Sequence, residues 1–129
     1  MPTPAPKDAL FPTTYLAGAA IVRGRALKRG ADANHCVQSA AATDVPLGIA
    51  VDHQQTAERP LRVADRPGET VYGEAGAAFA LDALLTSDAN GRLVTAASTN
   101  PVTAIARQAA GALGDLVAVE IAPRGYKAP

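Results

Sequence analysis

The chain has 129 residues, in which 12 Lys and Arg balance 12 Asp and Glu, and it contains one Cys and no Trp. This length suits one compact soluble domain, and no apolar run is long enough to cross a membrane. The zero net charge excludes a protein that holds nucleic acid or anionic lipid mainly through its bulk charge, because counterion release needs a dense cationic surface.

The chain opens with a proline-rich segment, and residues 1–16 are expected to form an extended arm rather than a helix. Proline lacks an N–H and fixes its own φ, and it moves the preceding residue out of the helical region. The segment has neither the basic start nor the apolar stretch of a signal peptide, so secretion is not expected. Such an arm can order on a partner, although a disordered tail is the alternative. Its predicted interface residues are Pro2, Pro4, Pro6, Leu10, Phe11 and Pro12.

A cluster of four cations follows the arm. Strand alternation would place Arg23 and Arg25 on one face, while Lys28 and Arg29 would enter a turn at Gly30. A basic surface of this kind can meet an acidic protein surface and set its orientation. Arg23 and Arg25 are therefore predicted interface residues, with a solvated strand face as the alternative.

An internal similarity relates two parts of the chain. Laying residues 32–50 over residues 88–106 without a gap gives eight identities, from Asp32/Asp88 to Ala50/Ala106. We interpret the similarity as one β-rich domain over 17–122 built from two related halves, about 17–66 and 67–122, followed by a tail at 123–129. Conservative matches in the same register are Val37/Leu93, Asp44/Asn100, Leu61/Val117 and Val63/Val119.

The local patterns within the halves predict short strands. Apolar residues alternate in residues 60–64 and 116–121, and turn signals recur along the chain at short intervals, which is typical of a small sandwich or barrel. The fold expected is mainly β. Residues 101–112 are favoured as a strand, although Asn100 as a cap and Pro101 at the first helical position leave room for one short helix.

Few residues in the sequence could carry catalysis or bind a metal. Cys36 lies next to His35, and adjacent side chains on a strand point to opposite faces, so they cannot form a nucleophile pair. The same objection applies to Asp52 and His53. One Cys and two His cannot build a four-ligand zinc site without carboxylates. We therefore predict no catalytic residue, no metal ligand and no cofactor, and we expect the chain not to be an enzyme.

Several segments together resemble the small β-rich capsid decoration, or cement, proteins of tailed bacteriophages. The resemblance covers about 17–121. It rests on residues 88–97, the paired segments 46–51 and 103–110, the closing strand 114–121 and the opening segment 17–27. Two positions depart from the pattern. Ala104 stands where a glycine like Gly48 is frequent, and Pro60 stands where a turn like that of Gly114 and Asp115 would be expected.

The resemblance implies a β-sandwich or tulip-like domain that acts as a homotrimer, binds the major capsid protein and stabilises the capsid. It would be made in the host cytoplasm and lie on the outer surface of the virion, without direct contact to nucleic acid or membrane. Composition gives a separate reason for self-association, because much of the apolar content is alanine and the core must be thin. The alternative function is a β-rich binding module for carbohydrate or another protein.

Overall fold

The computed structural model describes residues 13–123 and 125–129, in which every regular element is a β-strand. The predicted mainly β fold is confirmed, and this part of the chain holds no helix that could span a membrane. The strands are β1 (Thr13–Ala17), β2 (Ala26–Arg29), β3 (His35–Gln38), β4 (Gly48–Ala50), β5 (Pro60–Ala64), β6 (Thr70–Glu74), β7 (Leu84–Ser87), β8 (Leu93–Thr95), β9 (Ala104–Ala106) and β10 (Leu116–Ile121).

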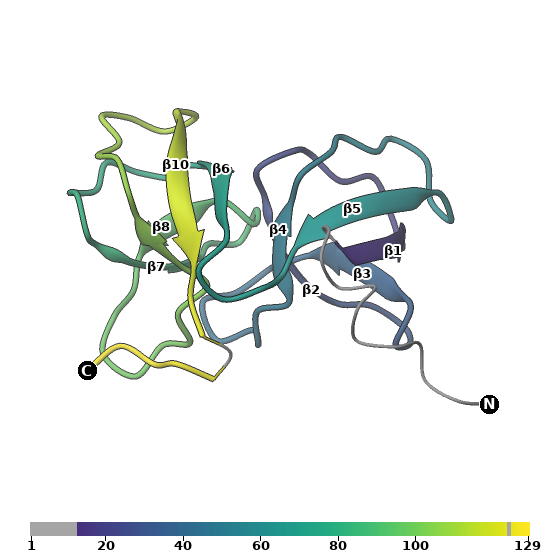
Figure 1. Cartoon of the computed structure of the whole chain (residues 1–129), viewed down its shortest axis with the longest axis horizontal. Coiled ribbons are helices and arrows are strands. Elements are labelled where there is room, and N and C mark those ends of the chain that lie inside the picture. Colours follow the sequence, from purple (N-terminus) through teal and green to yellow (C-terminus); the bar gives the residue numbers. More distant parts are fainter. Residues whose placement is uncertain (1–12, 124) are drawn as a thin grey trace.

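The strands form two units that lie side by side (Figure 1). The first is a closed barrel with the order β1-β3-β2-β4-β5, and the second is a five-stranded sheet with the order β6-β10-β9-β7-β8. Residues 13–16, which were expected to belong to the arm, are instead part of β1, because Thr13 already pairs with Val63 of β5. Thr and Tyr are frequent in strands, so residues 13–17 suit a strand, although the prolines before them in the sequence obscure this.

The two units repeat one connectivity. β1 pairs antiparallel with β5 as β6 does with β10, and β2 pairs with β3 and β4 as β7 does with β8 and β9. The parallel pairing of β1 with β3 corresponds to a single parallel bridge between Ala75 and Leu93. The second unit is therefore a copy of the first barrel whose closing seam is almost open.

The last two strands of the first unit, β4 and β5, correspond to β9 and β10 of the second unit. The residue correspondence is the one predicted from the sequence, in which Ala50 matches Ala106 and Val63 matches Val119. Ala50 pairs with Val63 in the first unit, and Ala106 pairs with Val119 in the second. These positions also alternate in the same sense, with all four side chains buried. The sequence matches in this region are matches between equivalent structural positions.

The register predicted for the third strand of each unit is wrong by one position. Arg29 pairs with Cys36 in the first unit and Ser87 pairs with Leu93 in the second, so Leu93 corresponds to Cys36 and not to Val37. A difference in turn length displaces the strand, and an alignment without gaps cannot follow such a difference.

Burial follows strand alternation and also joins the units. The barrel interior holds the apolar side chains of Leu27, Cys36, Ala50, Leu61 and Val63. On the outer side of the barrel, Ala26, Ile49 and Ala64 form a row across three strands and belong to the core cluster of the second unit. Full burial of Ile49 alone contributes roughly 1.5–3 kcal/mol. The two units therefore share one apolar core.

The segment over residues 101–112 contains a strand, as favoured, and the helix alternative is wrong. Ala104 and Ala106 are buried while Ile105 between them is half-buried, which is a period of two. The expected tail at 123–129 also packs on this region, because the N–H of Ala128 donates to the carbonyl of Asn100 and Ala128 is buried.

Candidate interaction surface

The predicted interface residues divide into two groups in the structure. The six residues of the proline-rich segment, namely Pro2, Pro4, Pro6, Leu10, Phe11 and Pro12, lie outside the described residues. Arg23 and Arg25 are described, and both lie between the two units. These two side chains have different environments and different roles.

Arg23 is not on a strand, which corrects the predicted alternation. It lies with Gly24 in a turn before β2, and Gly24 has φ of 86°, a conformation that a strand does not contain. The guanidinium carbon of Arg23 lies 5.8 Å from the ring centroid of Tyr72 on β6, within range of a cation–π interaction. Arg23 itself is exposed, and Tyr72 retains 52% of its accessible surface.

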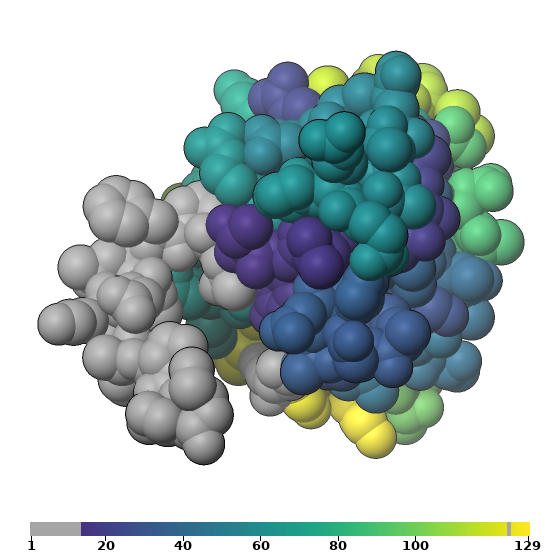
Figure 2. All heavy atoms as spheres, turned by 90° about the vertical axis from the view of Figure 1, so that its right-hand side faces the viewer, coloured from purple at the N-terminus to yellow at the C-terminus, as the bar shows by residue number. Residues whose placement is uncertain are grey.

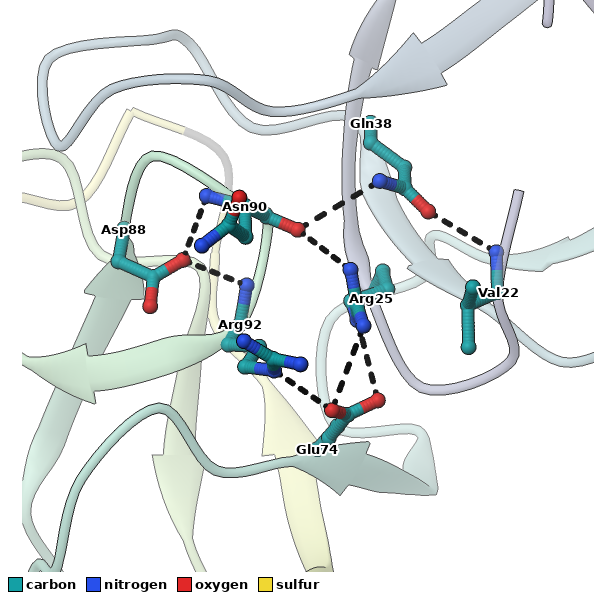
Figure 3. Close-up of polar contacts among 7 residues, drawn as sticks. All are labelled: Val22, Arg25, Gln38, Glu74, Asp88, Asn90 and Arg92. Atoms are coloured by element: carbon teal, nitrogen blue, oxygen red, sulfur yellow. Dashed lines mark hydrogen bonds and ion pairs between the residues drawn. The ribbon is translucent and has the colours of Figure 1, made fainter. Parts of the chain in front are cut away.

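Arg25 connects the two units and is not part of a free basic surface. The prediction that Arg25 is exposed at an interface with a partner is therefore also corrected. Its side chain is only 12% exposed, and its Nε donates to Oε1 of Glu74 at 3.0 Å. Its Nη1 donates to the carbonyl of Asn90 at 2.8 Å (Figure 3). Arg92 donates from Nε to the second carboxylate oxygen of Glu74 at 2.7 Å, so one carboxylate binds a guanidinium from each unit.

The electrostatics of this cluster favour the ionised carboxylate. Partial burial opposes the charge on Glu74, but hydrogen bonds from Arg25 and Arg92 outweigh it and hold the pKa of Glu74 below its ordinary value. The cluster therefore keeps its charges at neutral pH. It carries two cations and one anion in a half-buried position between the units.

Residues on either side of Arg25 form backbone hydrogen bonds in the open seam of the second unit, between β6 and β8. The N–H of Glu74, at the end of β6, donates to the carbonyl of Gly24 at 2.9 Å, and the N–H of Ala26 donates to the carbonyl of Gly91 at 2.7 Å. The segment from Gly24 to Ala26 therefore lies between β6 and the start of β8. It satisfies one backbone donor and one acceptor that the barrel would otherwise leave unpaired.

In the first unit, the equivalent groups bond directly to each other. Leu16 is the counterpart of Glu74, and Asn34 is the counterpart of Gly91; the N–H of Leu16 donates to the carbonyl of Asn34 at 2.7 Å. The first barrel therefore closes on its own. The second barrel is completed by the first unit.

The two other cations of the cluster are held on the first unit. Lys28 pairs with Asp44 at 3.4 Å, and Arg29 donates to the carbonyl of Ala33 at 3.3 Å. The carboxylate of Asp44 also accepts the N–H groups of Ala40 and Ala41. Lys28 and Arg29 therefore have local structural partners, and they do not extend the exposed surface at Arg23.

The fold built from these two units also occurs in a known phage protein. The chain is similar to the head fiber gp8.5 N base of bacteriophage phi29, with a TM-score of 0.62 and 20% sequence identity, over 85% of this chain and 92% of that chain. The two proteins share a fold. No protein-family model matches the sequence, and no curated protein matches it.

The sequence did not single out the exposed apolar residues beside Arg23. Tyr72 and Leu116 lie on the same face of the neighbouring strands β6 and β10, and Leu116 is 48% exposed. A Cβ built on Gly24 would lie 3.0 Å from Leu116, so this side chain borders the Arg23 turn. We call these residues the Arg23–Tyr72–Leu116 surface. Alternation within each strand would have indicated the face, but not that it stays uncovered.

A small cavity, a buried thiol and the metal-ligating residue types were also considered as sites in the described residues. A cavity of about 20 Å³ lies between the units, lined in part by Leu47, Thr103 and Ile121, and it has room for about one water. Cys36 is buried in the barrel, where burial raises the pKa of its thiol to about 11. Over residues 13–123 and 125–129, no group of three or more His, Cys, Asp or Glu side chains is arranged to hold a metal ion.

Proposed function

We propose that this chain is a structural protein of a phage virion that binds the outer surface of the assembled capsid and stabilises it as a decoration protein. The observation that carries the proposal is the shared fold with the head fiber gp8.5 N base of phage phi29, which extends over nearly all of both chains. The sequence resemblance to decoration proteins, which includes residues 88–97 and 114–121, supports the same class. The role needs no cofactor and no catalytic group.

The proposed partners are the major capsid protein and two further copies of this chain. The Arg23–Tyr72–Leu116 surface combines an aromatic residue, an arginine and an aliphatic residue, and aromatic residues and arginine are the types that carry most binding energy at protein interfaces. Its Tyr and Leu are about half exposed in the single chain. A homotrimer in solution should show a mass near three times the chain mass of 13.1 kDa by light scattering.

The proposal is tested directly by mixing the protein with capsids that lack a decoration protein. We expect added density of the size of this chain on the outer shell by electron microscopy, together with a higher temperature of capsid disruption. Capsids that show neither added density nor heat protection at saturating protein would contradict the proposed function.

Deleting residues 2–12 is expected to weaken retention on capsids markedly while leaving the melting temperature of the free domain nearly unchanged. The first strand that the structure describes begins at Thr13, so the deletion leaves every described strand intact. An extended segment of this length reaches about 40 Å, which is enough to span to a neighbouring subunit, and prolines lower the entropy lost on docking. A chain with a Gly/Ser segment of equal length is the control. Equal capsid retention by the deleted and full chains would show that the segment is only a tail.

Replacing Arg23 with alanine is expected to slow association with capsids and to reduce its dependence on salt. The side chain is exposed at the Arg23–Tyr72–Leu116 surface, and exposed charges act mainly on association rates. Association rates at low and high salt measure the effect. Arg59→Ala, at an exposed residue of the first unit, is the matched loss of charge. An equal change in both variants would point to net charge rather than to this surface.

A further inference from the structure

A histidine and two carboxylates form a cluster on the first unit, away from the surface described above. The Nδ1 atom of His35 lies 2.7 Å from Oδ1 of Asp32, and its Nε2 atom lies 2.9 Å from Oε1 of Glu58. The His35 side chain is 17% exposed, while the two carboxylates are more exposed. Because carboxylates only accept hydrogen bonds, both bonds form together only when each ring nitrogen carries a proton.

The cluster spans the strand that closes the first barrel. β1 lies between β3 and β5, and Leu16 pairs with His35 on one side and with Pro60 on the other. Figure 2 shows this arrangement on the surface, with β1 in purple between the teal atoms of the β5 region and the blue atoms of the β3 region. The bond from His35 to Glu58 therefore connects β3 to the turn that precedes β5, on the two sides of β1.

The backbone at Glu58 supports a role for its side chain. Glu58 has φ of 65°, in the left-handed region, and its N–H donates to the carbonyl of Ala17 at 2.7 Å. The equivalent bond in the second unit runs from Gly114, with φ of 93°, to the carbonyl of Ala75. A residue with a side chain is less stable than glycine in this conformation, because its Cβ crowds the backbone. The first unit thus has a carboxylate where the fold favours glycine, and that carboxylate meets His35.

The second unit has a permanent charge at the position of His35. The N–H of Gly30 donates to the carbonyl of His35 as the N–H of Asp88 donates to the carbonyl of Arg92, so Arg92 is the counterpart of His35. Arg92 binds Glu74 at the seam of the second unit. One seam is therefore held by a guanidinium, which stays charged, and the other by an imidazole, which can lose its charge.

The surroundings of His35 favour its protonated form. Hydrogen bonds to Asp32 and then to Glu58 raise the pKa of His35 to about 8, against the smaller effect of partial burial. The pKa is raised on folding, so the interaction is fully present below the ordinary histidine pKa of about 6.5 and is lost as the pH rises through about 8.

Several of the other charged groups on the neighbouring elements have partners of their own. On β2, Lys28 pairs with Asp44 and Arg29 donates to the carbonyl of Ala33. On β1, the hydroxyl of Tyr15 donates to Asp65. Arg59 follows Glu58, and Cys36, the next residue of β3, is buried in the barrel. The carboxylates that bond to the His35 ring are those of Asp32 and Glu58.

We propose that Asp32, His35 and Glu58 form a proton-controlled lock on β1, closed while the imidazole is protonated and released when it loses that proton. Release loosens the seam of the first barrel at Leu16 and Ala17, the last two residues of β1, and leaves the seam of the second unit closed. This inference does not depend on the proposed function.

Amide hydrogen exchange on the full chain tests the lock, with protection factors corrected for the intrinsic rate at about pH 6 and about pH 9. The amides of Leu16 and Ala17 donate to the carbonyls of Asn34 and Arg59, and they report on the seam. We expect their protection to fall several-fold at the higher pH. The amide of Ala75, the counterpart of Ala17, should keep its protection.

Two variants separate the lock from a merely structural contact. His35→Gln should show low protection of Leu16 and Ala17 at both pH values, whereas His35→Arg, which copies Arg92, should keep high protection at both. The proposal is overturned if the wild-type protection at Leu16 and Ala17 does not change with pH. It is also overturned if His35→Gln retains the same pH-dependent fall, or if Ala75 loses protection in parallel.

Discussion

Replacing Glu74 with alanine is expected to lower the free energy of unfolding by about 3 kcal/mol. The change leaves the guanidiniums of Arg25 and Arg92 in a half-buried position without the carboxylate that binds both. Uncompensated charge is costly there, and the lost contact is one that joins the two units. Urea denaturation measures the effect.

The matched control for Glu74 is Glu120→Ala, which removes the exposed ion pair between Glu120 and Arg107. Exposed pairs contribute at most about 1 kcal/mol, so this variant should unfold close to the wild type. Equal losses in the two variants would contradict the assignment of Glu74 as the electrostatic joint. If Glu74→Ala lowers the free energy of unfolding but the two units still unfold in a single transition, the result would agree with their shared core.

Replacing Gly48 with alanine is expected to destabilise the protein by about 3 kcal/mol, because overpacking in a closed interior forces the backbone to move. A Cβ on Gly48 would overlap the carbonyl oxygen of Ala64 and lie 2.9 Å from a methyl of Val63. The clash is with backbone of the neighbouring strand β5, which a side-chain rotation cannot relieve. Thermal and urea unfolding measure the loss.

Gly111→Ala serves as the control for Gly48. A Cβ there would have its nearest neighbour at 3.6 Å, the carboxylate of Asp115, which is an ordinary contact. We expect a change within about 0.5 kcal/mol. If Gly48→Ala were as stable as Gly111→Ala, the close approach of β4 to β5 would have to be wider than the structure shows.

The strand content and the internal repeat could be predicted because both are written in local patterns. Alternation identified β5 and β10, and the ungapped comparison matched them at the correct offset. The match of Asp44 with Asn100 also has a structural basis, since each side chain accepts an N–H in an equivalent turn, from Ala41 and Ala97.

The ungapped comparison matches the wrong residues at the turns, and the reason is physical. Asp32 and Asp88 each accept the N–H of the residue two positions later, so they form the same local turn. In the first unit, the turn is closed by the bond from the N–H of Gly30 to the carbonyl of His35, and Asp32 lies inside it. In the second unit, the shorter turn is closed by the bond from the N–H of Asp88 to the carbonyl of Arg92, so Asp88 lies at its start. Side-chain turn chemistry is local, so it can recur at positions that are not equivalent in the fold.

The role of Arg25 could not be predicted from its neighbours in the sequence. Its carboxylate partner, Glu74, lies 49 residues away, and the strand predicted around it is interrupted by the turn at Gly24. Pattern reasoning indicated a charged surface because it sees spacing within a segment. The insertion of residues 24–26 into the second unit depends on how the two units pack against each other. The pattern within a single segment of the sequence does not contain that information.

The same insertion favours folding of the first unit before the second while the chain is being synthesised on the ribosome. Residues 13–64 contain both sides of their own seam, with Leu16 and Asn34 bonded directly, so this half can close while the later residues are still being added. The second unit needs the backbone groups of Gly24 and Ala26 as hydrogen-bond partners between β6 and β8. The folded first barrel already holds these groups in place when β6 and β8 leave the ribosome. A gene fusion or permutation that delivered residues 70–121 first would expose an unfilled sheet edge until residues 24–26 arrived, which is the situation in which nascent strands aggregate.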